Sequence, residues 1–371
     1  MNWDHIASQR MTRRVLLRAS SRAGVGAAGL ALVGCGDDDD DAAAVAAAED
    51  EGAEPGDQAQ AEEQSARNDP STEQAEEPAA QAEGAAENAA EQGEEDAQTA
   101  VSPPDLGDLA PSPYVGAYTI NDAATSAQVT VTVGEGVRRI QSNGLPDHET
   151  GAFPNAANPN SISAQSYDHT LPLTPELAVA PTAYNVPQAF GIAVNGVSLD
   201  PFAAEWWQND RNSGWQLAAL ANPLGFDDHD AHVQPTGAYH YHGTPLVLAD
   251  ETDRPDLIGF AGDGFPIYGP YGYRDAADLR SGVVELRSSF ALKSGQRPDG
   301  PGGAYDGTYV EDYEYVAGSG ELDECNGRVG VTTEYPDGTY YYVASLQWPF
   351  LGRCFAGAIA ASFQNSGPGG R

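Results

Sequence analysis

The sequence predicts a mainly β, loop-rich single domain of the β-sandwich kind, with two related halves as a further hypothesis. The chain from residue 105 onward is rich in Gly, Pro, Tyr, Asn and Asp and has few long stretches of helical periodicity. Short runs in which apolar and polar residues alternate are separated by turns that contain glycine. We therefore place the folded domain at 105–363 and a flexible tail at 364–371.

The clearest strand is expected at 127–133, where Ala and Val alternate with Gln and Thr. This period-two pattern is typical of a strand with one buried face. A second strand is expected at 188–194. It turns at Asn195-Gly196 and returns through 197–199 as a hairpin.

Another hairpin is predicted from 257–261 and 265–268, joined by Gly262-Asp263-Gly264. Pro266 has no backbone N–H, so its strand should lie at a sheet edge or a bulge. One short helix is expected from Trp215 to Ala221, because the Asn-Pro pair that follows would end it.

An eight-residue pattern occurs twice, at 235–242 and 336–343. Both copies read Pro-x-Gly-small-Tyr-x-Tyr, a turn followed by a strand that presents aromatic side chains on one face. The repeat suggests two related hairpins in a duplicated fold. A structure that placed the copies in unlike elements would refute this hypothesis.

The N-terminus predicts export and membrane anchoring. Arg13-Arg14, followed by apolar residues and Arg18, has the order of a twin-arginine export signal. The apolar stretch 23–33 is too short to span a bilayer and runs into Leu32-Val33-Gly34-Cys35, which resembles a bacterial lipobox. We expect 1–34 to be a signal peptide and Cys35 to carry a lipid that anchors an extracytoplasmic protein to the bacterial cell membrane. The alternative is an ordinary signal peptide with a chance cysteine.

The segment 35–104 is expected to be a disordered acidic spacer. From Asp37 to Ala100 it carries 22 carboxylates and one cation, Arg67. Such a composition buries too little apolar area to offset the entropy of ordering, and its like charges, Gly and Pro disfavour the competing alanine-rich helix. The rest of the chain is also acidic, which argues against nucleic acid and anionic lipid headgroups as partners.

Two cysteines remain once Cys35 is assigned to lipid. Cys325 and Cys354 are an even pair in a chain expected to be exported, so we predict that they form a disulfide. Two free buried thiols are the alternative.

Histidines concentrate in 229–242, where His229, His232, His240 and His242 fall within 14 residues. Side chains two apart on a strand share a face, so His240 and His242 should point the same way. This spacing allows both imidazoles to hold one metal ion, as in His-x-His zinc and copper sites. His232, which precedes a turn, is the candidate third nitrogen ligand, whereas His229 is expected on a solvated loop.

Asp228 and Asp263 are the candidate carboxylates of this site, either as oxygen ligands or as groups that orient an imidazole. The expected metal is copper or zinc. The competing interpretation is that these histidines only form hydrogen bonds with carboxylates in an acidic protein.

The segment 237–243, Gly-Ala-Tyr-His-Tyr-His-Gly, resembles the signature of the YHYH domain family. The segments 228–234, 262–269, 322–327 and 334–340 are also similar to motifs of that family, and the resemblance covers most of 110–360. It implies a relationship and no particular activity. Members commonly carry histidine after Cys-Asn-Gly and within the second tyrosine run. This chain has Arg328 and Tyr341 there, so if the family site draws ligands from both blocks, this chain lacks some of them.

Three classes of function follow from these features. The first is a membrane-anchored metal-binding module whose acidic surface concentrates cations. The second is a metal-dependent hydrolase or oxidase, weakened by the absence of Gly-x-Ser-x-Gly and His-Glu-x-x-His motifs. The third is a non-enzymatic domain that binds a glycan or a protein through Trp206-Trp207 and Trp215. Calcium at 227–230 is disfavoured, because the spacing and glycine of a calcium loop are missing.

Overall fold

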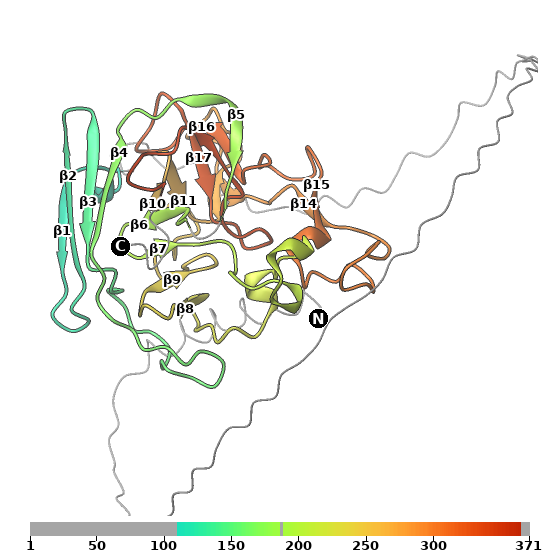
Figure 1. The fold of residues 1–371 in the computed structure, drawn as a ribbon. Helices are drawn as coiled ribbons and strands as arrows, with labels where there is room; N and C mark the ends of the chain where they lie inside the picture. The colour runs from blue at the N-terminus through green and yellow to red at the C-terminus, as the bar shows by residue number, and fades with distance from the viewer. Residues whose placement is uncertain (1–109, 186–187, 365–371) are drawn as a thin grey trace, which may run out of the picture. The chain divides into compact units, whose positions relative to one another are not determined.

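Two β-sheets and three two-stranded ribbons make up most of the regular structure in the computed structural model, which describes residues 110–185 and 188–364 (Figure 1). The first sheet is antiparallel, in the order β1 (Tyr118–Asn121), β2 (Gln128–Gly134), β3 (Val137–Ser142), β4 (Tyr167–Pro172). The second sheet has the order β16 (Gly327–Gly330), β17 (Thr339–Val343), β11 (Pro266–Tyr268), β10 (Leu257–Ala261), β6 (Gly191–Ala193), β7 (Ser198–Leu199), β9 (Tyr239–Tyr241), β8 (Ala231–Val233). The ribbons pair β12 (Tyr271–Tyr273) with β13 (Val283–Glu285), β14 (Phe290–Leu292) with β15 (Tyr313–Tyr315), and β18 (Cys354–Gly357) with β5 (Leu177–Ala183).

The protein is therefore mainly β and loop-rich, as predicted. The expected signal peptide at 1–34, the lipid site at Cys35 and the acidic spacer at 35–104 lie outside the described residues, as does the tail from 365 onward. Within the described ranges, helical structure is limited to 3-10 turns: η2 (Pro113–Val115), η3 (Trp207–Asn209), η4 (Arg211–Ser213), η5 (Ala219–Ala221) and η6 (Val310–Asp312). None of these described helices has the length and apolar character needed to cross a membrane.

The two sheets pack face to face through a shared core. Strand β2 buries Val129 and Val131 and exposes the residues between them, as the period-two pattern predicts. These valines belong to the same buried cluster as Ile192 of β6, Phe260 of β10 and Tyr341 of β17. A second cluster on the other face of the eight-stranded sheet holds Leu199, Ile267, Tyr239, Tyr241, Tyr342 and Phe355. The eight-stranded sheet is thus covered on both faces, which explains why its short strands are almost wholly buried.

Both predicted hairpins are confirmed, and they share one turn geometry. Gly196 has φ +79° and Gly264 has φ +93°, the left-handed region that glycine adopts without strain. In each turn, the amide of this glycine donates to the last residue of the first strand, Ala193 or Ala261. The hairpins β6–β7 and β10–β11 are antiparallel, as expected.

Pro266 was expected at a sheet edge or a bulge: the edge is wrong, because β11 lies between β10 and β17, whereas the pairing of β11 with β10 does contain an irregularity. Pro266 is the first residue of β11, and the parallel pairing with β17 begins only at Ile267, so no ladder bond needs its missing N–H. The irregularity in this hairpin falls on β10, between Leu257 and Gly259.

The helix expected from Trp215 to Ala221 is also wrong. Gln216 and Leu217 form isolated β-bridges with Trp206 and Tyr309, and only Ala219–Ala221 form a 3-10 turn. Backbone bonds to distant segments satisfy this stretch, which local propensity could not reveal.

The eight-stranded sheet has an internal pseudo-twofold arrangement. Each half begins at the centre of the sheet with a hairpin, β6–β7 or β10–β11. The outer strand of that hairpin pairs in parallel with the next strand outward, β7 with β9 and β11 with β17. An antiparallel edge strand, β8 or β16, completes each half. The halves meet where β6 pairs antiparallel with β10, with Ile192 opposite Phe260. The two copies of the sequence repeat lie in the like strands β9 and β17, which supports the hypothesis of a duplicated fold.

The correspondence between halves extends to single side chains. Tyr239 donates to Asp227 over 2.8 Å, and Tyr340 donates to Asp323 over 3.1 Å. The hydrogen bond between Asn195 and the Tyr241 hydroxyl corresponds to that between Asp263 and the Tyr342 hydroxyl. Asp230 and Asn326, which both have a left-handed backbone, also correspond. On the edge strands, His232 pairs with His240 as Arg328 pairs with Tyr341.

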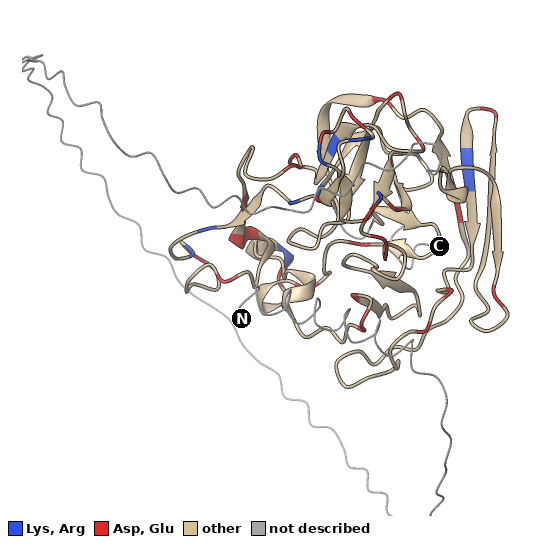
Figure 2. Cartoon of the chain, turned by 180° about the vertical axis from the view of Figure 1, so that it is seen from behind, with Lys and Arg blue, Asp and Glu red and all other residues tan. Residues whose placement is uncertain are grey.

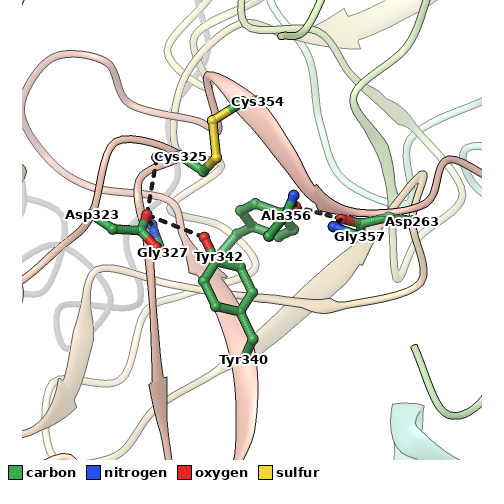
Figure 3. Close-up of a disulfide and its surroundings, with 9 residues drawn as sticks. All are labelled: Asp263, Asp323, Cys325, Gly327, Tyr340, Tyr342, Cys354, Ala356 and Gly357. Carbon is green, nitrogen blue, oxygen red and sulfur yellow. Dashed lines mark hydrogen bonds between the residues drawn. A yellow bond between two sulfur atoms is a disulfide. The ribbon is translucent and has the colours of Figure 1, made fainter. Parts of the chain in front are cut away.

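The predicted disulfide between Cys325 and Cys354 is confirmed (Figure 3). It joins the turn before β16 to the first residue of β18, with Cα atoms 4.7 Å apart. Asp323 fixes the same turn, because its carboxylate accepts bonds from the amides of Cys325 and Gly327.

Candidate metal centre

Three imidazoles converge at the edge of the eight-stranded sheet. His240 lies in β9 and His242 directly follows that strand. His232 lies opposite His240 on β8. The Nε2 atom of His242 is 2.7 Å from Nε2 of His240 and 3.1 Å from Nε2 of His232. Ligand nitrogens about 3.3 Å apart are expected around a tetrahedral zinc ion with Zn–N bonds of about 2.05 Å. The predicted group of three histidines therefore has the spacing of a metal site, which we name the His triad.

Backbone carbonyls set the tautomer of two of these rings. Nδ1 of His232 contacts the carbonyl oxygen of Leu224 at 2.9 Å, and Nδ1 of His240 contacts that of Ala238 at 3.2 Å. A carbonyl oxygen only accepts, so each Nδ1 carries the proton and each neutral ring directs a lone pair from Nε2 toward His242. His242 has one Nε2 position and can donate to only one of them. The triad without a cation therefore leaves at least one of these Nε2 lone pairs without a hydrogen from another ring of the triad.

Burial keeps these rings neutral. His240 and His242 are buried and His232 is half-buried. Desolvation, reinforced by the neighbouring His232, lowers the pKa of His240 to about 3, and burial together with the other two rings holds the pKa of His242 well below its ordinary value. Burial likewise lowers the pKa of His232. Neutral imidazole is the form that binds a metal, so the triad is in its ligand state at neutral pH.

The immediate surroundings hold the triad rigidly. Phe226 stacks on His232 with ring centroids 4.6 Å apart and meets His242 edge-on at 5.3 Å. The side-chain amide of Gln234 comes within 3.5 Å of Nε2 of His240. Gln234 was not predicted as a site residue, although its position two residues after His232 on the same face repeats the spacing of His240 and His242.

The carboxylates proposed for the site lie elsewhere. The ligand atoms of the His triad lie within 4.8 Å of one another, and this group contains neither Asp228 nor Asp263. Asp263 lies near the disulfide instead, where it accepts bonds from the Tyr342 hydroxyl and the Gly357 amide (Figure 3). It also accepts a bond from the amide of Phe265. Asp228 is exposed on the turn before β8. Period-two spacing placed the histidines correctly, but it gave no information on which loop carboxylates would approach them.

His229 also points away from the triad. Its Nε2 contacts the carbonyl of Glu149 at 3.0 Å, and its ring lies 4.3 Å from that of His148. His148 lies far along the chain from the histidine-rich segment 229–242. In the structure, Nε2 of His148 accepts from the Tyr241 hydroxyl over 2.6 Å, on the reverse face of β9. His148 and Tyr241 are 93 positions apart and no local pattern connects them.

The equivalent position in the second half holds no group of histidines. Arg328 donates from Nε to the Tyr341 hydroxyl over 2.6 Å, and Val343 takes the place that corresponds to His242. A guanidinium donor and a phenol fill this edge of the sheet. The symmetric scaffold thus carries one His triad among the described residues.

A cavity of about 320 Å³ lies beside the triad. His232 and His242 form part of its wall, together with Asp200, Glu205 and Arg211. These last three residues were not predicted, because they come from the segment that follows β7.

A family model described as YHYH protein matches residues 168–357 of this chain. The chain belongs to the YHYH family. The matched range includes the whole eight-stranded sheet, and the motif that names the family is β9 with His242. No curated protein and no solved structure matches the chain.

Asp200 gives this YHYH protein a testable pH dependence. The Tyr184 hydroxyl lies 2.5 Å from both Asp200 Oδ1 and the Gln188 carbonyl oxygen. A phenol has one hydrogen, so one of the two contacts requires a proton on Asp200. Burial raises the pKa of Asp200 to about 7. The folded state therefore binds more protons than the unfolded state between pH 3.8 and 7, and this group makes stability fall as pH rises through that range.

We expect Asp200→Asn, which is neutral at every pH, to remove this component. Its free energy of unfolding should exceed that of the wild type by up to about 4 kcal/mol at pH 9, with little difference at pH 4. Urea unfolding of chelator-treated protein across this pH range measures the effect. A constant difference between the two proteins at all pH values would contradict it.

Proposed function

We propose that this protein is a metal-binding module of the cell envelope that holds a zinc or copper ion in the His triad. The observation that carries the proposal is the convergence of three Nε2 atoms, two of which present lone pairs to the third. Buried acceptor nitrogens at this separation repel one another, whereas a cation between them turns the same arrangement into three favourable bonds. Three neutral nitrogen ligands suit both zinc and copper.

The hydrogen-bond partners of the other ring nitrogens support the same conclusion. Metal-bound histidines usually donate their other ring nitrogen to a carbonyl or a carboxylate, which fixes the ring orientation. His232 and His240 do so, through Leu224 and Ala238. The competing idea that these histidines pair with carboxylates is weaker for His232 and His240, because their Nδ1 atoms contact backbone carbonyls instead.

Metal analysis of the full chain, purified without a polyhistidine tag, tests the proposal. We expect about one equivalent of metal per chain, and less than a tenth of that in His240→Ala/His242→Ala. The matched control is His229→Ala, which removes a histidine of the same loop that faces away from the triad. No stoichiometric metal in the wild type, or equal loss in the control, would contradict the proposal.

We also propose the location: export by the twin-arginine route and a lipid on Cys35 that anchors the chain to the membrane. The support is the order of motifs in 1–35 and the disulfide, which is typical of oxidising compartments. Mass spectrometry of the mature protein should show an N-terminus at a diacylated Cys35. An unmodified cysteine would exclude the anchor.

The glycan-binding alternative has weaker support. Trp215 is buried and donates from its indole to Asp299, so it is not available for a surface platform. The enzymatic alternative has one favourable observation, the cavity beside the triad.

A further inference from the structure

We infer that the cavity beside the His triad binds a small carboxylate-type oxyanion, which completes the coordination of the metal. This inference rests on the proposed metal site and adds the class of ligand. It follows from the position of the cavity, the number of protein ligands and the balance of charge.

The cavity meets the triad directly. His232 and His242 belong to its lining, and so does Gln234, whose amide approaches His240. Asp200 is brought alongside by the parallel pairing of β7 with β9, in which its amide donates to the carbonyl of Tyr241 over 2.8 Å. A molecule in this space of about 320 Å³ therefore lies against the rings that hold the metal.

The protein supplies three ligands, and a further position is left for a small molecule. Structural zinc sites are closed by four protein ligands, whereas sites with three protein ligands keep a position for water or substrate. Among the described residues, the group suited to metal binding contains no carboxylate or thiolate beside the three histidines. The fourth ligand must then come from outside the protein or from a neutral group such as the Gln234 amide.

Charge decides between an anion and a neutral ligand. Three neutral imidazoles leave the double charge of the metal uncompensated. Asp200 and Glu205 in the lining carry at most two negative charges against the positive charge of Arg211, so the loaded cavity keeps a net positive charge. Of the carboxylates in the turn before β8, Asp227 is engaged on the reverse face by Tyr239 and by backbone amides.

Arg211 makes the site suited to an oxyanion. It is exposed at the start of η4 in the cavity lining, and it takes part in none of the salt bridges among the described residues. Basic side chains are scarce in this chain, with 18 Lys and Arg against 55 Asp and Glu. Figure 2 accordingly shows only a few blue segments. A guanidinium matches the geometry of a carboxylate, which it can bind through two parallel hydrogen bonds. The pairing of a metal with one arginine therefore favours a small carboxylate.

Cobalt(II) provides the probe, because its visible absorption reports coordination number and ligand exchange. The full chain is loaded with one equivalent of cobalt(II) and titrated with acetate, and with acetamide as a neutral molecule of the same shape. We expect acetate to shift the absorption bands saturably and acetamide to leave them unchanged. Arg211→Gln should weaken acetate binding roughly fivefold, as is typical for loss of a partly exposed ion pair. Arg280→Gln, which removes an exposed arginine outside the cavity lining, is the matched control and should bind acetate like the wild type.

The outcomes separate this inference from the proposed function. If cobalt(II) binds and acetate does not change its spectrum, or if acetamide acts equally, the oxyanion site is excluded and the metal site stands. Equal acetate affinity in Arg211→Gln and Arg280→Gln would also overturn the inference. If cobalt(II) does not bind and metal analysis finds no stoichiometric zinc or copper, the proposed function itself fails.

Discussion

Zinc at a hundred times its dissociation constant should raise the free energy of unfolding of this protein by about 2.7 kcal/mol. The reason is that the triad exists only in the folded chain, where β8 and β9 bring His232 opposite His240. Zinc therefore binds the folded state more tightly than the unfolded state. The value is an upper bound, because unfolded histidines retain some affinity for the metal. Thermal and urea unfolding with and without a chelator measure it.

The same experiment distinguishes the triad from the other histidines. Replacing His232, His240 or His242 singly by Ala should abolish most of the zinc-dependent gain, since two imidazoles hold zinc far less tightly than three. His148→Ala is the control, because it breaks the bond from the Tyr241 hydroxyl and lowers basal stability without touching the triad. It should keep the full zinc-dependent increment. A zinc effect that survives in His242→Ala, or disappears in His148→Ala, would show that the metal binds elsewhere.

The site was predictable where its geometry is local. Two histidines at i and i+2 on a strand share a face by construction, and the turn through Gly237 brings His232 back beside them. Gly237 has φ +85°, and a Cβ on it would overlap the Ser163 side chain, so this turn depends on glycine. The sequence shows this Gly as part of the repeat.

The rest of the site depends on contacts between distant segments. Glu205 and Arg211 reach the cavity through the loop after β7, and His148 reaches Tyr241 from the long connection between β3 and β4. The same limit explains the incorrect helix at 215–221, whose backbone bonds go to residues near 205 and 309. Local periodicity carries no information about such partners.

The fold was predictable because turn chemistry and strand periodicity agree. Asn195-Gly196 and Asp263-Gly264 mark the two central hairpins, and the repeated Pro-x-Gly turn marks the two outer ones. The parallel pairing of β7 with β9 and of β11 with β17 was not predictable from one sequence. It depends on which strand of each outer hairpin pairs with the central hairpin, and that is decided by tertiary contacts.

Removing the disulfide should have the second large effect. Cys325→Ala/Cys354→Ala is expected to lower the free energy of unfolding by about 3–4 kcal/mol, because the bridge links positions 29 apart in the sequence and restricts the unfolded chain. That loss is a large fraction of the roughly 5–15 kcal/mol typical of a folded domain. Both cysteines are replaced together, so that no free thiol can form mixed disulfides. Equilibrium urea unfolding in non-reducing buffer measures the change.

The effect should be confined to stability. The bridge joins the turn before β16, at the edge of the sheet opposite the triad, to β18 of a separate ribbon, and neither cysteine contributes to the metal site. The double variant should therefore bind one equivalent of metal at a temperature well below its unfolding midpoint. A loss of less than about 1 kcal/mol would mean that the unfolded chain is already restricted in this region. Loss of metal binding by the folded variant would show that the two halves of the sheet are coupled, and that the pseudo-twofold arrangement transmits distortion across the β6–β10 junction.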